Sequence, residues 1–352
     1  MERDLPAKKD LRWGAWGPYA WNGLLLLAAA VLSVGVGSVF IPPAAVAQLA
    51  IARLAGLPLG DWPESFATIL FQIRLPHMAL VALTGAALAS SGAAYQGLFR
   101  NPLADPYLIG VASGAGLGAV LVMSLHWPSD LLGFYSVPVG AFLGAVLTVG
   151  VVYYLARLGG SVATTTLILA GVAASAFASA LTSYLMLRSN EELRRALSWL
   201  LGGGLMGGWE PVKAVLPYLL IGMGVLALSG HSLNVMQFGD EQAQQLGIPV
   251  ERRKLLLILA ASLTTAAAVA FSGIIGFVGL IVPHIMRLIW GPDYRRLILL
   301  SVLGGGSALL LADVLARVLL APQTLPVGIV TALAGAPFFL WVLRRSRRYG
   351  QE

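Results

Sequence analysis

Residues Phe238–Lys254 read FGDEQAQQLGIPVERRK and form the most polar segment between the long apolar runs of the chain. Asp240 is predicted to cap a short helix that ends at Leu246, because Gly247 can take the left-handed conformation and Pro249 blocks continuation. The segment is therefore interpreted as a loop that meets something outside a membrane. The alternative is a plain solvated loop, and the surrounding sequence decides between the two.

The composition indicates a membrane protein. Of the 352 residues, 58% are hydrophobic and 11% are charged, whereas soluble domains carry about 25% charged residues. A span needs about 20 apolar residues, so roughly ten spans leave only short loops. The sequence predicts an all-α polytopic membrane protein with a single domain, residues 1–352. The chain has no cysteine, which excludes disulfides, thiol catalysis and cysteine metal sites.

Ten apolar runs are expected to span the bilayer. The eighth run is short, and its separation from the seventh depends on a turn at Gly273 and Gly276, so nine spans is the alternative. The segment at about 189–211 is amphipathic and is expected to form an interfacial or re-entrant helix on the outer side, with Trp199 and Trp209 near the headgroups. The runs lie near 22–41, 77–98, 108–125, 137–158, 167–187, 214–229, 255–274, 275–288, 297–320 and 326–343.

The basic residues predict the orientation. With the N-terminus in the cytoplasm and ten spans, 16 of the 23 Arg and Lys residues fall inside, as the positive-inside rule expects. Both termini and the loop at about 238–254 then face the cytoplasm, where Arg252, Arg253 and Lys254 are interpreted as topology anchors. The net charge of +7 is therefore assigned to topology and not to nucleic-acid binding.

The spans almost lack carboxylates. Of the 16 acidic residues, only Asp313 is expected within a span, and Arg317 on the same helix face is its simplest partner. Proton- or sodium-driven carriers usually hold carboxylates or unwound polar sites at mid-membrane, which disfavours the alternative of an ion-coupled secondary transporter. An intramembrane enzyme is disfavoured because no catalytic cluster is seen.

The chain also lacks an energy source of its own. It has no GxxxxGKS or GxxxxGKT phosphate loop to bind ATP. A partner subunit that supplies energy is therefore expected, and the cytoplasmic loop is where it would bind.

Two pairs of polar residues have two readings each. Arg74 and His77, at the outer start of the second run, either reach the headgroups or bind an acidic partner. Thr164 and Thr165 either cap the fifth span or line the inner mouth of a pathway. The four histidines are scattered through the chain, so no metal site is predicted.

Six ordered blocks of the sequence resemble the permease subunits of type II ABC importers for iron chelates, haem and cobalamin. The resemblance covers most of the chain. The blocks are RLP at 74–76, GAALASSGAAYQGLFRNPLADPYLIG at 85–110, GDEQAQQLGIP at 239–249, IGFVGLIVPHIMRL at 275–288, LADVLAR at 311–317 and LPVGIVTALAGAPFFLW at 325–341.

The resemblance implies the type II ABC importer permease fold, with about ten transmembrane helices. It implies a homodimer with the pathway on the twofold axis, two ATP-binding cassette subunits below, and one periplasmic or extracellular substrate-binding protein above. The chain itself would be no enzyme and hold no cofactor, because ATP and magnesium would bind the partner ATPase. A multi-pass protein of the bacterial inner membrane is expected, with haem, a ferric siderophore or cobalamin as the cargo.

The resemblance also implies site residues. Docking of the binding protein is expected at Arg74, His77 and Arg317. His77 stands where the family often has an arginine, so the docking charge there would be weaker and pH-dependent. The cytoplasmic gate is expected at Thr164 and Thr165, and the fifth span would line the pathway. The ATPase-coupling loop is expected at Asp240, Glu241, Gln242, Gln245, Leu246, Gly247 and Ile248.

Overall fold

The computed structural model describes residues 16–37, 41–58, 62–125, 133–158, 162–188 and 193–349, without the side chains of 343 and 345–349. No strand occurs among these residues. The helical elements in chain order are α1 (Gly17–Gly35), α2 (Pro43–Ala55), α3 (Glu64–Thr68), η1 (Ile69–Arg74), α4 (Leu75–Leu98), η2 (Pro106–Ile109), α5 (Val111–Ser124), η3 (Gly133–Tyr135), α7 (Ser136–Arg157), α8 (Thr164–Arg188), α9 (Leu193–Leu200), α10 (Trp209–Leu228), α11 (Gly230–Met236), α12 (Asp240–Gln245), α13 (Val250–Ser272), α14 (Val278–Trp290), α15 (Tyr294–Val318) and α16 (Val327–Tyr349).

The all-α polytopic fold class is confirmed. Seven helices of the described part are long and apolar enough to cross a membrane, and four shorter apolar helices accompany them. Each of the ten predicted runs overlaps one helix, but ten crossings stays a prediction. The eighth run is a separate helix, α14. The predicted turn is confirmed, because Gly273 and Gly276 both lie between Ser272, the end of α13, and Val278, the start of α14. This turn uses positive φ angles at Gly273 (78°) and Phe277 (69°).

The largest departure from the prediction is near the N-terminal end of the described chain. α1 ends at Gly35, six residues earlier than the predicted run, and a separate apolar helix, α2, follows from Pro43. α2 has 13 residues, which is too short for a span. The second span begins earlier than predicted, because one continuous helical stretch runs from Glu64 to Leu98.

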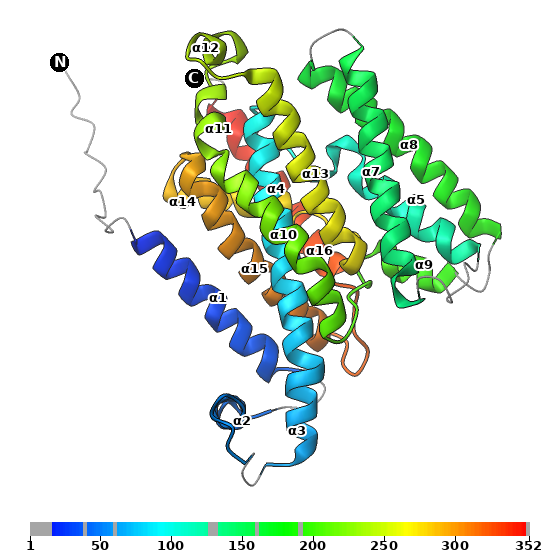
Figure 1. Cartoon of the computed structure of the whole chain (residues 1–352), viewed down its shortest axis with the longest axis vertical. Coiled ribbons are helices and arrows are strands. Elements are labelled where there is room, and N and C mark those ends of the chain that lie inside the picture. Colours follow the sequence, from blue (N-terminus) through cyan, green and yellow to red (C-terminus); the bar gives the residue numbers. More distant parts are fainter. Residues whose placement is uncertain are drawn as a thin grey trace.

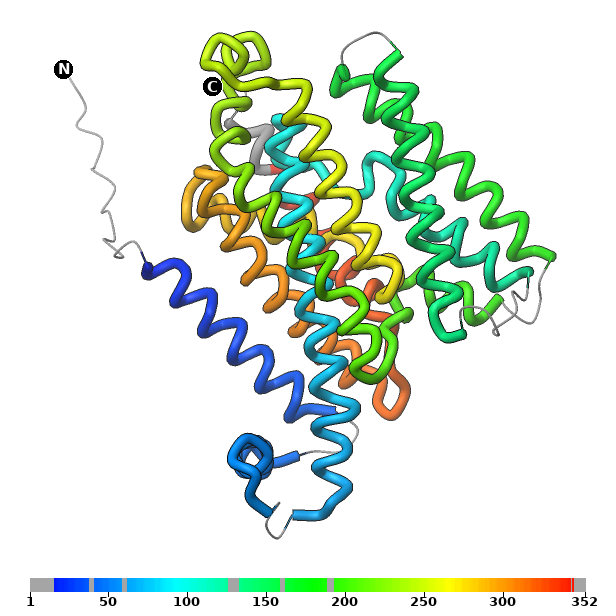
Figure 2. Tube along the Cα trace, in the orientation of Figure 1, coloured from blue at the N-terminus to red at the C-terminus, as the bar shows by residue number. Residues whose placement is uncertain are grey.

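The second span supplies the centre of the fold. Its α4 part packs against α10, α13, α14 and α15, and Figure 2 shows this cyan tube passing through the middle of the bundle. Residues 84–99 are all buried, so α4 has no solvent or lipid face there. The small residues of this stretch let neighbouring backbones approach closely.

Gly92 in α4 is the tightest of these approaches. A Cβ at Gly92 would overlap the carbonyl oxygen of Gly279 in α14. We expect Gly92→Ala to lower the stability by about 1–3 kcal/mol, the usual cost of overpacking, measured as a lower thermal unfolding midpoint in detergent. The matched control is Gly150→Ala in α7, where a Cβ meets nothing within 4 Å. Equal midpoints for the two variants would contradict this packing.

A second group of helices lies beside the central bundle. α5 packs against α7, α8 and α9, and α13 connects this group to the bundle through contacts with α7 and α5. Figure 2 shows the group in teal and green to the right of the central helix. α8 lies on its outer side and buries 17% of its most apolar stretch, the smallest share among the seven long helices of the described part.

The bundle has two distinct ends (Figure 1). α12 and the C-terminal end of α16 lie at one end, called here the α12 end. α2 and the start of the second span lie at the opposite end, the α2 end. The predicted coupling residues and the predicted docking residues therefore lie at opposite ends of the molecule.

Candidate functional site

α12 forms the tip of the α12 end, and its limits largely follow the sequence prediction. The helix has six residues, Leu246 is its C-cap, and Gly247 has a φ of 83°. The predicted cap by Asp240 is wrong, because the N-cap position belongs to Gly239, whose φ of 115° suits glycine. The carboxylate of Asp240 is instead engaged by basic side chains from elsewhere.

Asp240 fixes α12 to the helices below it. Its carboxylate lies 2.5 Å from Nζ of Lys254 in α13 and 3.8 Å from Nη2 of Arg100, just beyond α4. The side chain of Lys254 is 7% exposed. The interpretation of Lys254 as a topology anchor is therefore wrong, because this ammonium faces the protein and not the water. Arg252 is exposed, as an anchor would be.

The outer face of α12 presents polar side chains around two apolar ones. Leu246 is 68% exposed, and Phe238, just before the helix, is 72% exposed. Ala243 faces inward and is fully buried, while Ile248 is half-buried and packs against the core. Exposed apolar residues rimmed by polar ones often mark an interaction site. The remaining predicted coupling residues on this face, all exposed, are Glu241, Gln242, Gln245 and Gly247.

Phe238 was not among the predicted coupling residues. The signal available from the sequence was that Phe238 is the only aromatic residue in the polar stretch FGDEQAQQLGIPVERRK. We include it with Leu246 in the candidate coupling surface, which consists of Phe238, Glu241, Gln242, Gln245, Leu246 and Gly247.

A polar cluster supports the same end from beside α12. The side-chain amide of Asn234 in α11 donates to Asp293, and its carbonyl oxygen accepts from the N–H of Tyr294. Partial burial alone would raise the pKa of Asp293, but hydrogen bonds from Asn234 and from the N–H of Arg295, with the charges of Arg295 and Arg296, hold it below its usual value. Asp293 is thus a stable anion that ties α11 to the start of α15.

The predicted gate residues lie at the first turn of α8. Thr164 is half-buried and Thr165 is exposed. Two residues earlier, Val162 is buried and contacts α13 through its backbone. The gate assignment itself stays a prediction.

Arg74 and Arg317 come together at the α2 end, around the last turn of α1. Arg74 donates from Nη1 to the carbonyls of Val34 and Gly35, at 2.5 and 3.1 Å. Arg317 donates to the carbonyl of Ser33 at 3.1 Å and to that of Val36 at 2.7 Å. These are carbonyls that a helix end leaves without intrahelical partners, and cations stabilise a helix C-terminus.

Asp313 links this cluster to His77. Its carboxylate lies 3.0 Å from Nε2 of His77 and 3.0 Å from Nη2 of Arg317. The expected pairing of Asp313 with Arg317 is confirmed. Snorkelling of Arg74 to the headgroups is wrong, because this side chain points into the protein and Arg74 is 7% exposed. The structure thus brings the three predicted docking residues to one place, and docking stays a prediction.

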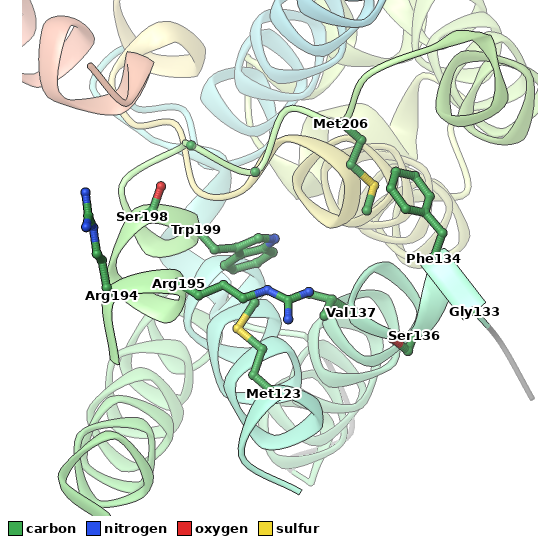
Figure 3. Close-up of a pocket in the computed structure, with 12 residues that line it drawn as sticks. Met123, Gly133, Phe134, Ser136, Val137, Arg194, Arg195, Ser198, Trp199 and Met206 are labelled. Atoms are coloured by element: carbon green, nitrogen blue, oxygen red, sulfur yellow. The ribbon is translucent and has the colours of Figure 1, made fainter. Parts of the chain in front are cut away.

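A cavity of about 600 Å³ opens near the end of α5, between α7 and α9. In Figure 3 the side chain of Arg195 crosses it toward Val137, with the Trp199 ring above it in this view, whereas Arg194 points away. Trp199 is 6% exposed and belongs to the core, so its predicted place among the headgroups is wrong. Residues 189–192 of the predicted amphipathic segment lie outside the described residues. Among the described residues, no three of His, Cys, Asp or Glu gather into a group fit for a metal ion.

Comparison with known proteins gives one family. Residues 25–345 match the model of the FecCD transport family. The chain is 42% identical over 343 residues to the uncharacterized ABC transporter permease protein YvrB of Bacillus subtilis, covering 97% of each chain. It is 47% identical over 296 residues to the cobalamin import system permease protein BtuC of Halobacterium salinarum, covering 84% of this chain and 78% of the relative.

Two further matches extend the comparison. The hemin transport system permease protein HmuU of Yersinia pestis is 42% identical over 287 residues, which is 79% of this chain and 84% of that protein. A solved structure described as a metal-chelate type ABC transporter in an inward-facing conformation superposes with a TM-score of 0.77 at 31% identity, covering 93% of this chain and 98% of the other.

Proposed function

Because the chain belongs to the FecCD transport family, we propose that it forms the membrane pathway of an ATP-driven importer whose cargo is a bulky metal chelate. The chain is a permease of the type II ABC importer class and carries out no catalysis itself. What it does for transport is therefore mechanical: it opens and closes a route through the bilayer when partner subunits move.

The coupling surface at the α12 end supports an external energy source. Leu246 and Phe238 are exposed at the tip of the molecule, where a soluble partner can cover them, and the chain has no phosphate loop for ATP. We assign this surface to the partner ATPase, which would hold ATP and magnesium. The α12 end then faces the cytoplasm of a bacterial inner membrane. Residues 1–15, which carry four of the basic residues behind the predicted orientation, lie outside the described residues.

The exposed face of α8 supports a homodimer with the pathway on its axis. Val172 and Phe177 lie on this face and are more than half exposed, whereas Gly171 and Ala178 are buried against the chain. A second copy would cover part of this face and leave the small, uncharged side chains of α8 along the route. Lipid is the alternative cover, and the mass of the detergent-solubilised protein distinguishes the two.

The class of cargo is taken from the relatives. Their names give cobalamin and hemin import, and a further relative, YfmE of Bacillus subtilis, is named as an Fe(3+)-citrate import system permease protein. These cargoes share a chelated metal but differ in the chemistry of the chelating ligand. We propose a cargo from this class: haem, a ferric siderophore or cobalamin. The ligand that copurifies with the cognate binding protein tests this directly. A metal chelate is the expected result, and a free amino acid or sugar would contradict it.

A further inference from the structure

Val162, two residues before α8, is held by α13 at both of its backbone polar groups. Its N–H donates to Oε2 of Glu251 at 3.4 Å, and its carbonyl accepts from Nζ of Lys254 at 3.4 Å. Glu251 and Lys254 occupy one face of the first turn of α13 and lie 3.8 Å apart. The side chain of Val162 is 4% exposed and packs in the main core. The position of the chain at the start of α8 is therefore set by the side chains of Glu251 and Lys254.

The same Lys254 ammonium binds α12. It lies 2.5 Å from Oδ2 of Asp240, the first residue of that helix. A buried ammonium is stable only while it is paired and hydrogen-bonded, and Lys254 is 6% exposed. Its position is therefore set jointly by Asp240, Glu251 and the carbonyl of Val162, so a displacement of α12 changes the balance of contacts at α8.

From these contacts we propose that Lys254 is a positioning residue that transmits movement of α12 to the inner end of α8. The proposal rests on the proposed function, in which the ATPase moves α12. When the partner displaces Asp240, the Lys254 ammonium either moves with the carboxylate or loses its ion pair with it. In both cases the hydrogen bond from Lys254 to the carbonyl of Val162 changes. Thr164 lies two residues after Val162, so a displacement of Val162 reaches the predicted gate at Thr164 and Thr165 through one intervening residue.

The route does not depend on α13 moving as a rigid body. α12 also packs directly against α13, so packing alone would also carry some displacement. Packing would act on the whole of α13, whereas the Lys254 ammonium and the Glu251 carboxylate act on the backbone of Val162. Removing either polar group separates the two routes while the apolar contacts remain.

The test uses the complete importer in proteoliposomes: two copies of the chain, the ATPase and the binding protein, with its copurified chelate as the cargo. Lys254→Met removes the ammonium and keeps an apolar stem, and the carboxylates that it leaves behind, Asp240 and Glu251, are 37% and 47% exposed and can be solvated by water. We expect ATP hydrolysed per cargo imported to rise about fivefold or more, the range of coupling between linked sites. The matched control is Arg252→Met, which removes an exposed charge from the same helical turn.

Two further variants separate transmission from stability. Glu251→Ala leaves the Lys254–Asp240 pair in place and removes the partner of the Val162 N–H together with the weaker 3.8 Å pair with Lys254, so it is also expected to raise the ATP cost per cargo. Lys254→Arg keeps the charge and the donors and is expected to restore coupling. A purely structural role for Lys254 predicts instead a lower unfolding midpoint with an unchanged ATP cost.

A spectroscopic readout follows the movement itself. The chain has no cysteine, so a spin label at Thr166→Cys, an exposed position in the first turn of α8, reports the distance between the two copies. We expect this distance to change on ATP binding in the wild-type background and to change less with Lys254→Met. Wild-type coupling in both Lys254→Met and Glu251→Ala would overturn the proposal. Absence of ATP-driven import by the wild-type complex would overturn the proposed function instead.

Discussion

Glu241→Lys combined with Leu246→Asp is expected to uncouple the importer. Both side chains project from the outer face of α12, and Leu246 is 68% exposed, so the fold of the chain should remain intact. In the complex, an aspartate would replace the apolar tip of the surface that meets the ATPase. Loss of about 1.4 kcal/mol of binding free energy corresponds to a factor of ten, so import and binding-protein-stimulated ATP hydrolysis should each fall by at least about tenfold.

The control for this variant is Glu241→Asp combined with Leu246→Met, which keeps the charge and the apolar tip at the same two positions. It should import cargo at close to the wild-type rate. Both variants should elute as the same monodisperse species in detergent. If the charge-reversed variant retains import and stimulated hydrolysis, the coupling assignment of α12 is wrong.

The second large effect is expected at the α2 end, where Arg317→Glu should destabilise the chain. The substitution would place a second carboxylate beside Asp313 and leave the carbonyls of Ser33 and Val36 without their donor. Breaking a buried pair by removing one partner costs about 3–5 kcal/mol. The thermal unfolding midpoint in detergent should fall clearly, with Arg317→Lys showing a smaller loss.

Docking has to be separated from this structural role. Arg74→Lys keeps the charge, whereas Arg74→Met keeps only the apolar stem. If Arg74 attracts an acidic binding protein, Arg74→Met should weaken its capture at low salt, where charge attraction is least screened, and Arg74→Lys should not. Equal affinity of both variants for the binding protein at low salt would show that Arg74 only holds the C-terminal end of α1 and takes no part in docking.

The apolar spacing predicted the helices well because a span must satisfy its backbone internally and must be long enough to cross the lipid. α2 was missed because its 13 residues are too few for a span. The first span was predicted six residues too long because residues 22–41 form one apolar run, and composition does not show where α1 ends. Gly35 ends it, and the arginines that hold this end come from 39 and 282 residues farther along the chain. Such long-range partners leave no local pattern.

The candidate site was predicted in the same uneven way. Gly247 and Leu246 were correct because a left-handed glycine and a helix end are local events. Asp240 and Lys254 were wrong because a capping aspartate and a basic anchor are the usual roles of these residues, and only the fold shows that the two meet. Phe238 was not included because the predicted short helix begins two residues later, at Asp240, and only the fold shows that this side chain is exposed beside it.

ATP-dependent uptake by the complete importer tests the central claim most directly. The chain, its cognate ATPase and its binding protein are reconstituted in sealed proteoliposomes, and uptake of the copurified chelate is measured with ATP on the ATPase side, or with a proton or sodium gradient and no ATP. We predict that uptake requires ATP and the binding protein and is indifferent to either gradient. Uptake driven by an ion gradient without the ATPase would contradict the account and identify an ion-coupled carrier.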